Sequence, residues 1–468
     1  MVFSSLPFLF VFLPAFFLIY GLAPGRFKNA VLFWGSVAFY AYGALETPLY
    51  IALLLVTIWV NWRIGLHLGP EGRYRRLWLV LGLCYDFFWL LLFKYAGFFF
   101  DNGAAVWNAL TGAGISRTWS LLLPIGISFY TFQIASYLVD VYWKKVPPER
   151  SLIDLGAYLC MFPQLIAGPI VQYTQVAREL RSRRTNLARI DRGLRIFVLG
   201  LGSKVLLANL TGGLWSDVQA IGLESLSTPL AWMAAAAYSF QLYFDFYGYS
   251  LMAVGLGMVM GFDLPQNFRQ PYQSVSMTEF WRRWHITLGS WFREYVYIPL
   301  GGNRGSGAKT IRNLLVVWLL TGFWHGASWN FLLWGLFLFL VLVIERAGLR
   351  AFLEKHRLLG HGYMVLLIPL SWMLFANTEP GQLSMIFTRL FALDGSFSGP
   401  FPGDWLQPLR DYGWLLAACL LFCTPLPEKL WRRLERTPLA VVVLLGIFWA
   451  AVYCLYKGLN DPFLYFRF

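Results

Sequence analysis

Charged side chains are scarce in this sequence, since Asp, Glu, Lys and Arg make up only 13% of its 468 residues, about half the share found in soluble domains. No long polar block separates the apolar segments that recur from Phe3 to Phe466. Hydrophobic residues reach 58% and aromatic residues 19%, which suits a chain in lipid, where Trp and Tyr gather at the two interfaces. We therefore expect an all-α polytopic membrane protein with a single membrane domain over residues 1–468.

The usual signatures of hydrolases, nucleotide-binding proteins and metalloenzymes are missing. There is no GxSxG, P-loop or HExxH sequence. The five cysteines lie in apolar segments and form no CxxC pair, so neither a disulfide framework nor a zinc site is expected. The sequence thus predicts no metal site and no bound cofactor.

Apolar segments are numerous enough for about 11 to 12 transmembrane helices, because a helix needs roughly 20 apolar residues to cross the hydrocarbon core. Two further segments, Leu152–Val171 and Phe280–Gly302, are broken by prolines or charges and are expected to be re-entrant. The expected spans are Leu6–Leu22, Ala30–Tyr42, Leu49–Trp62, Leu77–Phe100, Leu121–Trp143, Ile196–Leu210, Pro229–Tyr249, Leu314–Ile344, Tyr363–Phe375, Trp414–Leu426 and Leu439–Tyr456.

The net charge of +14 is concentrated in short loops. A basic chain can bind nucleic acid, but basic loops between apolar segments are typical of the cytoplasmic side of a membrane protein. Placing these loops in the cytoplasm puts both chain ends outside, provided that Leu314–Ile344 is a hairpin of two short helices. The loops hold 25 Lys or Arg residues against six acids: Arg63–Arg76, Lys144–Arg150, Arg178–Arg195, Arg304–Arg312, Arg346–Arg357 and Lys429–Arg436.

His325 is the most informative of the five histidines. It follows Arg312 by 13 residues, or about 20 Å of helix, which carries it past the middle of a membrane. Ionisable groups at that depth mark functional sites, and a neutral imidazole can take a proton from a hydroxyl. The alternative is a structural histidine that bonds to a neighbouring helix, and spacing alone does not separate the two.

His285 lies in an aromatic and basic stretch, residues 280–293, with Arg282 and Arg283 beside it. Arginines can meet phosphates through two hydrogen bonds, so this stretch could cradle an anionic donor. Trp and Arg are also common membrane-interface anchors, which is the alternative. Asp245 and Asp263 flank a segment rich in Gly and Met, and buried acids there could carry protons or tie helices together.

Several ordered motifs resemble the membrane-bound O-acyltransferase (MBOAT) family, and in particular its bacterial branch of alginate O-acetylases, which has relatives acting on cellulose, peptidoglycan and teichoic acids. The resemblance spans nearly the whole chain, with most motifs within residues 121–345. It is carried by Met1–Ser5, Pro124–Tyr130, Phe162–Ile170, Trp281–His285, Tyr297–Arg304 and Gly322–Ala327.

The resemblance implies a ring of helices around a central funnel, with acetyl-CoA as the acyl donor entering from the cytoplasm. It implies that His325 and His285 are the catalytic histidines, and that a periplasmic acetyltransferase of the SGNH type, together with a polysaccharide synthase and export complex, completes the transfer. The expected location is the bacterial inner membrane. The residues expected near the donor are Arg282, Arg283, Trp284, Trp324 and Asn330.

The C-terminal residues 461–468 resemble the aromatic ending of related acyl-transfer systems, in which the residue that matches Tyr465 is an acyl carrier. The alternative for Tyr465 is an interfacial anchor. The expected activity is O-acetylation of an exported polysaccharide of the alginate or cellulose type. A transporter or flippase subunit without chemistry is the alternative, although the matched half-repeats typical of transporters are not visible.

Overall fold

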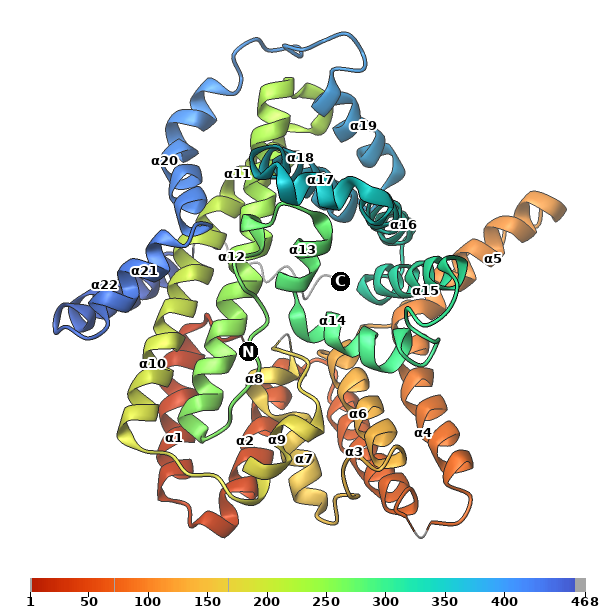
Figure 1. Ribbon diagram of the computed structural model, residues 1–468, viewed down its shortest axis with the longest axis vertical. Helices are drawn as coiled ribbons and strands as arrows, with labels where there is room; N and C mark the ends of the chain where they lie inside the picture. Colours follow the sequence, from red (N-terminus) through yellow and green to blue (C-terminus); the bar gives the residue numbers. More distant parts are fainter. Residues whose placement is uncertain (1, 71, 167, 459–468) are drawn as a thin grey trace. The chain divides into compact units, whose positions relative to one another are not determined.

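The computed structural model describes residues 2–70, 72–166 and 168–458. These residues form helices joined by turns and loops, with no β-strand in the described part of the chain (Figure 1), so the all-α prediction is confirmed. The chain divides into two compact units. The first comprises the chain through Leu194 together with Ala253–Pro265, and the second comprises Arg195–Met252 and everything from Gln266 onward. The single membrane domain and the funnel stay predictions.

The first unit is a set of short and long apolar helices. Its helices are η1 (Phe8–Phe12), α1 (Leu13–Leu22), η2 (Gly25–Phe27), α2 (Lys28–Gly43), α3 (Leu49–His67), α4 (Arg75–Leu90), η3 (Leu91–Tyr95), α5 (Ala96–Thr111), α6 (Ile127–Tyr142), α7 (Leu152–Cys160), α8 (Phe162–Leu165) and α9 (Tyr173–Arg181). Within it α2 packs against α7, and α4 packs against α6. The unit boundary falls inside α10 (Leu187–Gly202) and α12 (Thr228–Met260).

The second unit contains the segments with the histidine motifs. Its helices are η4 (Ser203–Asn209), α11 (Leu210–Ile221), η5 (Leu223–Ser225), η6 (Pro271–Gln273), α13 (Met277–Arg283), α14 (Ile286–Phe292), η7 (Arg293–Tyr297), α15 (Gly307–His325), α16 (Trp329–Ile344), η8 (Glu345–Leu349), α17 (Arg350–Lys355), α18 (Arg357–Ala376), α19 (Pro380–Phe391), α20 (Leu406–Phe422), α21 (Leu426–Leu434) and α22 (Leu439–Tyr456). The most extensive packing is that of α15 on α16.

The described residues contain seven helices long and apolar enough to cross a membrane, or eight if the bent pair α20 and α21 is one span. This is fewer than the 11 to 12 expected, because several apolar segments form shorter helices. The helix α2 has 16 residues, which is about 24 Å of helix at 1.5 Å per residue. A continuous helix from Arg75 to Thr111 has 37 residues and outruns a typical span of about 20.

The expected span Leu121–Trp143 differs from the structure at its start. The helix α6 begins only at Ile127, and residues 112–124 are irregular. Gly126 has a φ of +72°, and a Cβ there would collide with the carbonyl oxygen of Leu165. The turn before α6 therefore needs glycine, and Pro124 has no N–H to continue a helix backwards.

Both segments expected to be broken consist of short helices. Residues 152–165 form α7 and the four-residue α8, which the non-helical backbone of Met161 separates. Residues 277–297 form α13, α14 and the π-helical η7, and His285 separates the first two with a φ of +44°. The second break places His285 on irregular backbone, as expected for a segment that is covered by protein.

Candidate active site

His325 is the last residue of α15, at the turn of a helical hairpin. The next residues, Gly326–Ser328, are not helical, and α16 then returns along α15, which confirms the predicted hairpin. A Cβ at Gly322 would collide with the carbonyl oxygen of Phe331, so glycine allows the two helices to approach closely.

Aromatic rings from three helices enclose the His325 ring. Its centroid lies 5.0 Å from Trp324, 5.2 Å from Trp334 on α16 and 5.1 Å from Phe375 on α18, each in an edge-to-face arrangement. The residue is only 5% exposed. The imidazole is therefore held by packing in a largely apolar surrounding, where electrostatic interactions are stronger than in water.

His285 is also buried, and it joins two short helices. It caps the start of α14 in the left-handed conformation and is 1% exposed. Its Nδ1 lies 3.1 Å from the side-chain oxygen of Asn267, and its ring meets the ring of Phe246 edge-to-face at 4.7 Å. His285 lies outside the candidate spans. Burial lowers its pKa to about 3, because an apolar surrounding disfavours the charged form.

One indole ring joins the two histidines. The ring of Trp324 lies 6.2 Å from His285 and 5.0 Å from His325, and Trp324 is itself buried. His285, Trp324 and His325 are here called the histidine cluster. Residues 40 positions apart in the sequence thus meet within one unit, as two buried imidazoles that share one indole neighbour. Imidazoles are the most common proton-transfer groups in enzymes.

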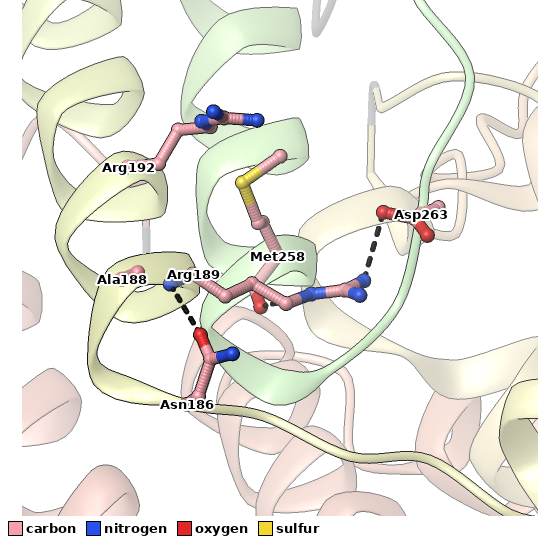
Figure 2. A pocket seen from close by; sticks show the side chains of 6 residues that line it. All are labelled: Asn186, Ala188, Arg189, Arg192, Met258 and Asp263. Atoms are coloured by element: carbon pink, nitrogen blue, oxygen red, sulfur yellow. Dashed lines mark hydrogen bonds and ion pairs between the residues drawn. The ribbon is translucent and has the colours of Figure 1, made fainter.

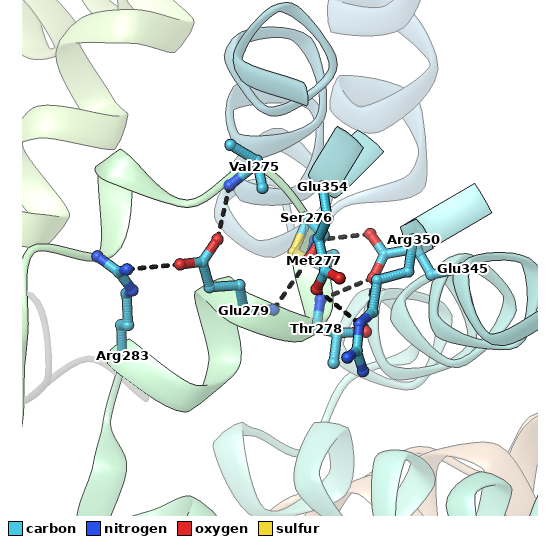
Figure 3. Close-up of polar contacts among 9 residues, drawn as sticks. All are labelled: Val275, Ser276, Met277, Thr278, Glu279, Arg283, Glu345, Arg350 and Glu354. Carbon is cyan, nitrogen blue, oxygen red and sulfur yellow. Dashed lines mark hydrogen bonds and ion pairs between the residues drawn. The ribbon is translucent and has the colours of Figure 1, made fainter. Parts of the chain in front are cut away.

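Glu345 holds the start of the helix that leads to His285 (Figure 3). Its carboxylate accepts hydrogen bonds from the backbone N–H groups of Met277 and Thr278, at 2.6 and 2.8 Å, and from the hydroxyls of Thr278 and Tyr363, at 2.6 and 3.1 Å. The first N–H groups of a helix have no partner within it, and a negative charge stabilises that end. Glu345 is 1% exposed, so α13 is tied firmly to the end of α16.

The side chains expected near a donor occupy different surroundings. Arg283 forms an ion pair with Glu279, at 2.5 Å (Figure 3). Trp284 is buried and stacks on the ring of Phe280 at 5.4 Å. The amide of Asn330 donates to the carbonyl oxygens at the end of α18. Arg282 is exposed, and the described residues offer it no ion pair.

Two residues that hold the histidine cluster escaped the sequence analysis, and so did the partner of Asp245. Asn267 reaches His285 from a loop 18 residues earlier, a contact that no local pattern signals. Glu345 is an acid directly after the apolar helix α16, and that position is a usable signal.

Asp245 pairs with Lys204 at 2.8 Å, with both side chains 1% exposed, an arrangement that ties α12 to η4.

Asp263 belongs to a pocket of about 290 Å³ in the first unit (Figure 2). It pairs with Arg189 at 2.8 Å, and the Nε–H of Arg189 also donates to the carbonyl oxygen of Met258. Arg192 extends along the same pocket, and no ion pair is found for it in the described parts of the chain. None of the residues predicted for the acyl-transfer site is among those that line this pocket. Tyr465 lies outside the described residues.

Comparison with known proteins places these contacts in context. The model of the membrane-bound O-acyltransferase family, MBOAT, matches residues 149–370. The chain is 40% identical over 409 residues to the probable alginate O-acetylase AlgI of Azotobacter vinelandii, covering 86% of this chain and 79% of that protein. It is 42% identical over 381 residues to the protein of the same name from Pseudomonas aeruginosa, covering 80% and 72%. It is 36% identical over 433 residues to the peptidoglycan O-acetyltransferase of Helicobacter pylori, covering 84% and 80%.

Proposed function

Since this chain belongs to the membrane-bound O-acyltransferase family, we propose that it transfers acetyl groups from cytoplasmic acetyl-CoA toward an exported polysaccharide. It is a multi-pass membrane protein and an O-acyltransferase. Relatives that share 36% to 42% identity are named for O-acetylation of alginate or peptidoglycan, which supports acetyl as the group transferred. The proposed location is the bacterial inner membrane, with the basic loops in the cytoplasm.

The observation that carries this proposal is the histidine cluster. His325 acts as the general base: a ring nitrogen takes the proton of an incoming hydroxyl while its oxygen attacks the thioester carbonyl. The carbon–sulfur bond then breaks, and CoA leaves as the thiol after taking up a proton. General-base help of this kind is worth about 10²–10⁴-fold in rate.

Acetyl-CoA presents phosphates that the protein must meet at its cytoplasmic face. Arg282 suits this role because it is exposed and has no ion pair among the described residues, whereas Arg283 already neutralises Glu279. Trp284 and Asn330 then support the site by packing and by helix capping instead of contacting the donor. A charged CoA could not cross the hydrocarbon core, so only the acetyl group moves outward.

The incoming hydroxyl that receives the acetyl group is proposed to be that of Tyr465, on the far side of the membrane. The serine of a periplasmic SGNH-type acetyltransferase would then take the acetyl group from Tyr465 and pass it to the sugar. A polysaccharide synthase and export complex would supply the polymer, an exopolysaccharide of the alginate or cellulose type. Tyr465→Phe removes the hydroxyl and keeps the ring, so unchanged polymer acetylation in that variant would reduce Tyr465 to an anchor.

Inverted membrane vesicles from polymer-producing cells test the chemistry directly, because they expose the cytoplasmic face to added donor. With acetyl-CoA labelled in the acetyl group, wild-type vesicles are expected to release CoA thiol and retain label on polymer inside. His325→Ala is expected to lower both signals by about 10²-fold or more. His356→Ala, at an exposed position, serves as the matched control and leaves both unchanged.

The same assay separates the proposal from a transporter or a structural subunit. Either alternative predicts that the vesicles release no CoA thiol from acetyl-CoA, whether they contain the wild-type protein or the variant. That result, obtained with normal amounts of protein in the membrane, would contradict the enzymatic proposal.

A further inference from the structure

Asn267 contacts His285, in the break between α13 and α14, and the first two residues of α14. Its backbone carbonyl accepts from the N–H of Ile286 at 2.9 Å. Its side-chain oxygen lies 3.2 Å from the backbone nitrogen of Thr287 and 3.0 Å from the hydroxyl of that residue. The same oxygen lies 3.1 Å from Nδ1 of His285. Asn267 is 1% exposed, and its side chain is held through this oxygen, since its amide nitrogen has no hydrogen-bond partner among the described residues.

The contact with Thr287 fixes which way the Asn267 amide points. A backbone N–H can only donate a hydrogen bond, so the side-chain atom that faces it must be the oxygen. Turning the amide over would place its NH₂ group against another donor inside the protein, and a buried donor without an acceptor is costly. Asn and Gln orientations are assigned from such networks, and here one obligatory donor decides.

The amide orientation in turn decides the protonation of His285. Its Nδ1 faces an oxygen that can only accept, so Nδ1 must carry the hydrogen. In a neutral imidazole the other nitrogen, Nε2, then holds the lone pair. The ring is neutral around pH 7, since burial lowers the pKa of His285 to about 3.

We propose that Asn267 is a positioning residue that fixes His285 as the Nδ1–H tautomer, so that Nε2 is its only proton acceptor in the acyl-transfer site. The chemical part of this inference rests on the proposed function. A neutral ring of this tautomer has no N–H to offer from Nε2. It therefore cannot polarise the thioester carbonyl by donating a hydrogen bond. His285 contacts the reactants by accepting from an O–H or N–H group, and any donor to the carbonyl is another residue.

The tautomer can be measured without any assay of activity. The chain has five histidines, so protein labelled with ¹⁵N-histidine in lipid nanodiscs gives few signals, and His285→Gln identifies the signals of interest. At neutral pH we expect a protonated Nδ1 and an unprotonated Nε2. A protonated Nε2 with a bare Nδ1, or a doubly protonated ring, would overturn the inference.

Three variants then test the role of Asn267. Asn267→Ala removes the acceptor, so we expect a mixture of tautomers and a fall in acetyl transfer on the order of 10- to 100-fold, the range known for groups that orient metal-ligating histidines. Asn267→Asp keeps an acceptor and adds a negative charge, so we expect the Nδ1–H tautomer, a higher His285 pKa and a new decline of rate toward acid pH. Asn377→Ala removes another buried amide, which donates to the carbonyl oxygen of Met373 in α18, and is expected to leave the histidine spectrum unchanged.

The outcomes distinguish this inference from the proposed function. If Asn267→Ala keeps the wild-type tautomer and rate, Asn267 is not a positioning residue, although transfer that depends on His325 would still support the enzyme. If Asn267→Ala fails to fold, Asn267→Asp still decides, because loss of the Nδ1–H tautomer or an unshifted pH profile in that variant would overturn the inference. Loss of the reaction in wild-type vesicles would remove the proposed function and leave the tautomer to be settled by the spectrum alone.

Discussion

Replacing Glu345 by Ala removes the group that holds the start of α13. In the structure its carboxylate accepts from the backbone N–H groups of Met277 and Thr278 (Figure 3). It also accepts from the hydroxyls of Thr278 and Tyr363. Both N–H groups belong to the first turn of α13, where the helix itself offers no acceptor. Ser276 caps a different N–H group, that of Glu279, so it does not replace the lost contacts.

The magnitude follows from those contacts. A hydrogen bond to a charged group is worth about 1.5 to 3 kcal/mol, so losing the two backbone bonds should lower the free energy of unfolding by about 3 to 6 kcal/mol. Glu345→Gln keeps one acceptor oxygen and is expected to fall between Ala and wild type. Because α13 leads directly to His285, the Ala variant should also lose acetyl transfer more than its residual folded fraction explains.

The assay is SDS-induced unfolding in mixed micelles, followed by circular dichroism and by proteolysis of the segment around α13. Glu354→Ala is the matched control, since Glu354 is a half-exposed acid of the same region that pairs with Arg350 (Figure 3) and such pairs contribute about 0 to 1 kcal/mol. Equal stability of the Glu345 and Glu354 variants, with normal acetyl transfer in both, would refute the role assigned to the Glu345 carboxylate.

Three further predictions concern charge. Lys204→Met or Asp245→Leu alone removes one charge of a buried pair and should cost about 3 to 5 kcal/mol, whereas the double variant should recover most of it in the same unfolding assay. Between the folded His285 pKa of about 3 and the ordinary histidine pKa of 6.5, only the unfolded chain binds a proton at this residue. The free energy of unfolding should therefore rise with increasing pH in this range, by up to about 1.4 kcal/mol per pH unit. Thermal unfolding of His285→Gln should lack this slope. Arg282→Ala should raise KM for acetyl-CoA roughly tenfold, while Arg304→Ala, an exposed arginine of another basic loop, should not.

The hairpin around His325 follows from the sequence because two physical signals coincide there. The apolar run Leu314–Ile344 is long for one span, and small residues interrupt it directly after the histidine. The break at His285 is similarly visible, since arginines among aromatics cannot continue a lipid-facing helix. The MBOAT motifs indicated the family that the comparisons then confirmed.

The supporting contacts and the span count could not be derived in the same way. Asn267 reaches His285 across 18 residues, and such a contact depends on packing that no periodic pattern encodes. The predicted number of membrane spans was too high because an apolar segment has the same composition whether protein or lipid covers it. The helix α6 illustrates this, since 14 of its residues are buried and it has only 16, fewer than the roughly 20 that a full crossing requires.

The most direct test of the histidine cluster as an acyl-transfer site is the acetyl content of exported polymer in cells. A strain that lacks its own alginate O-acetylase would carry wild type, His325→Ala or the control His356→Ala, at matched protein levels. The account predicts that wild type and His356→Ala restore O-acetyl groups on the polymer, as read by proton NMR, and that His325→Ala leaves it bare. Full acetylation by the His325→Ala variant would contradict the account.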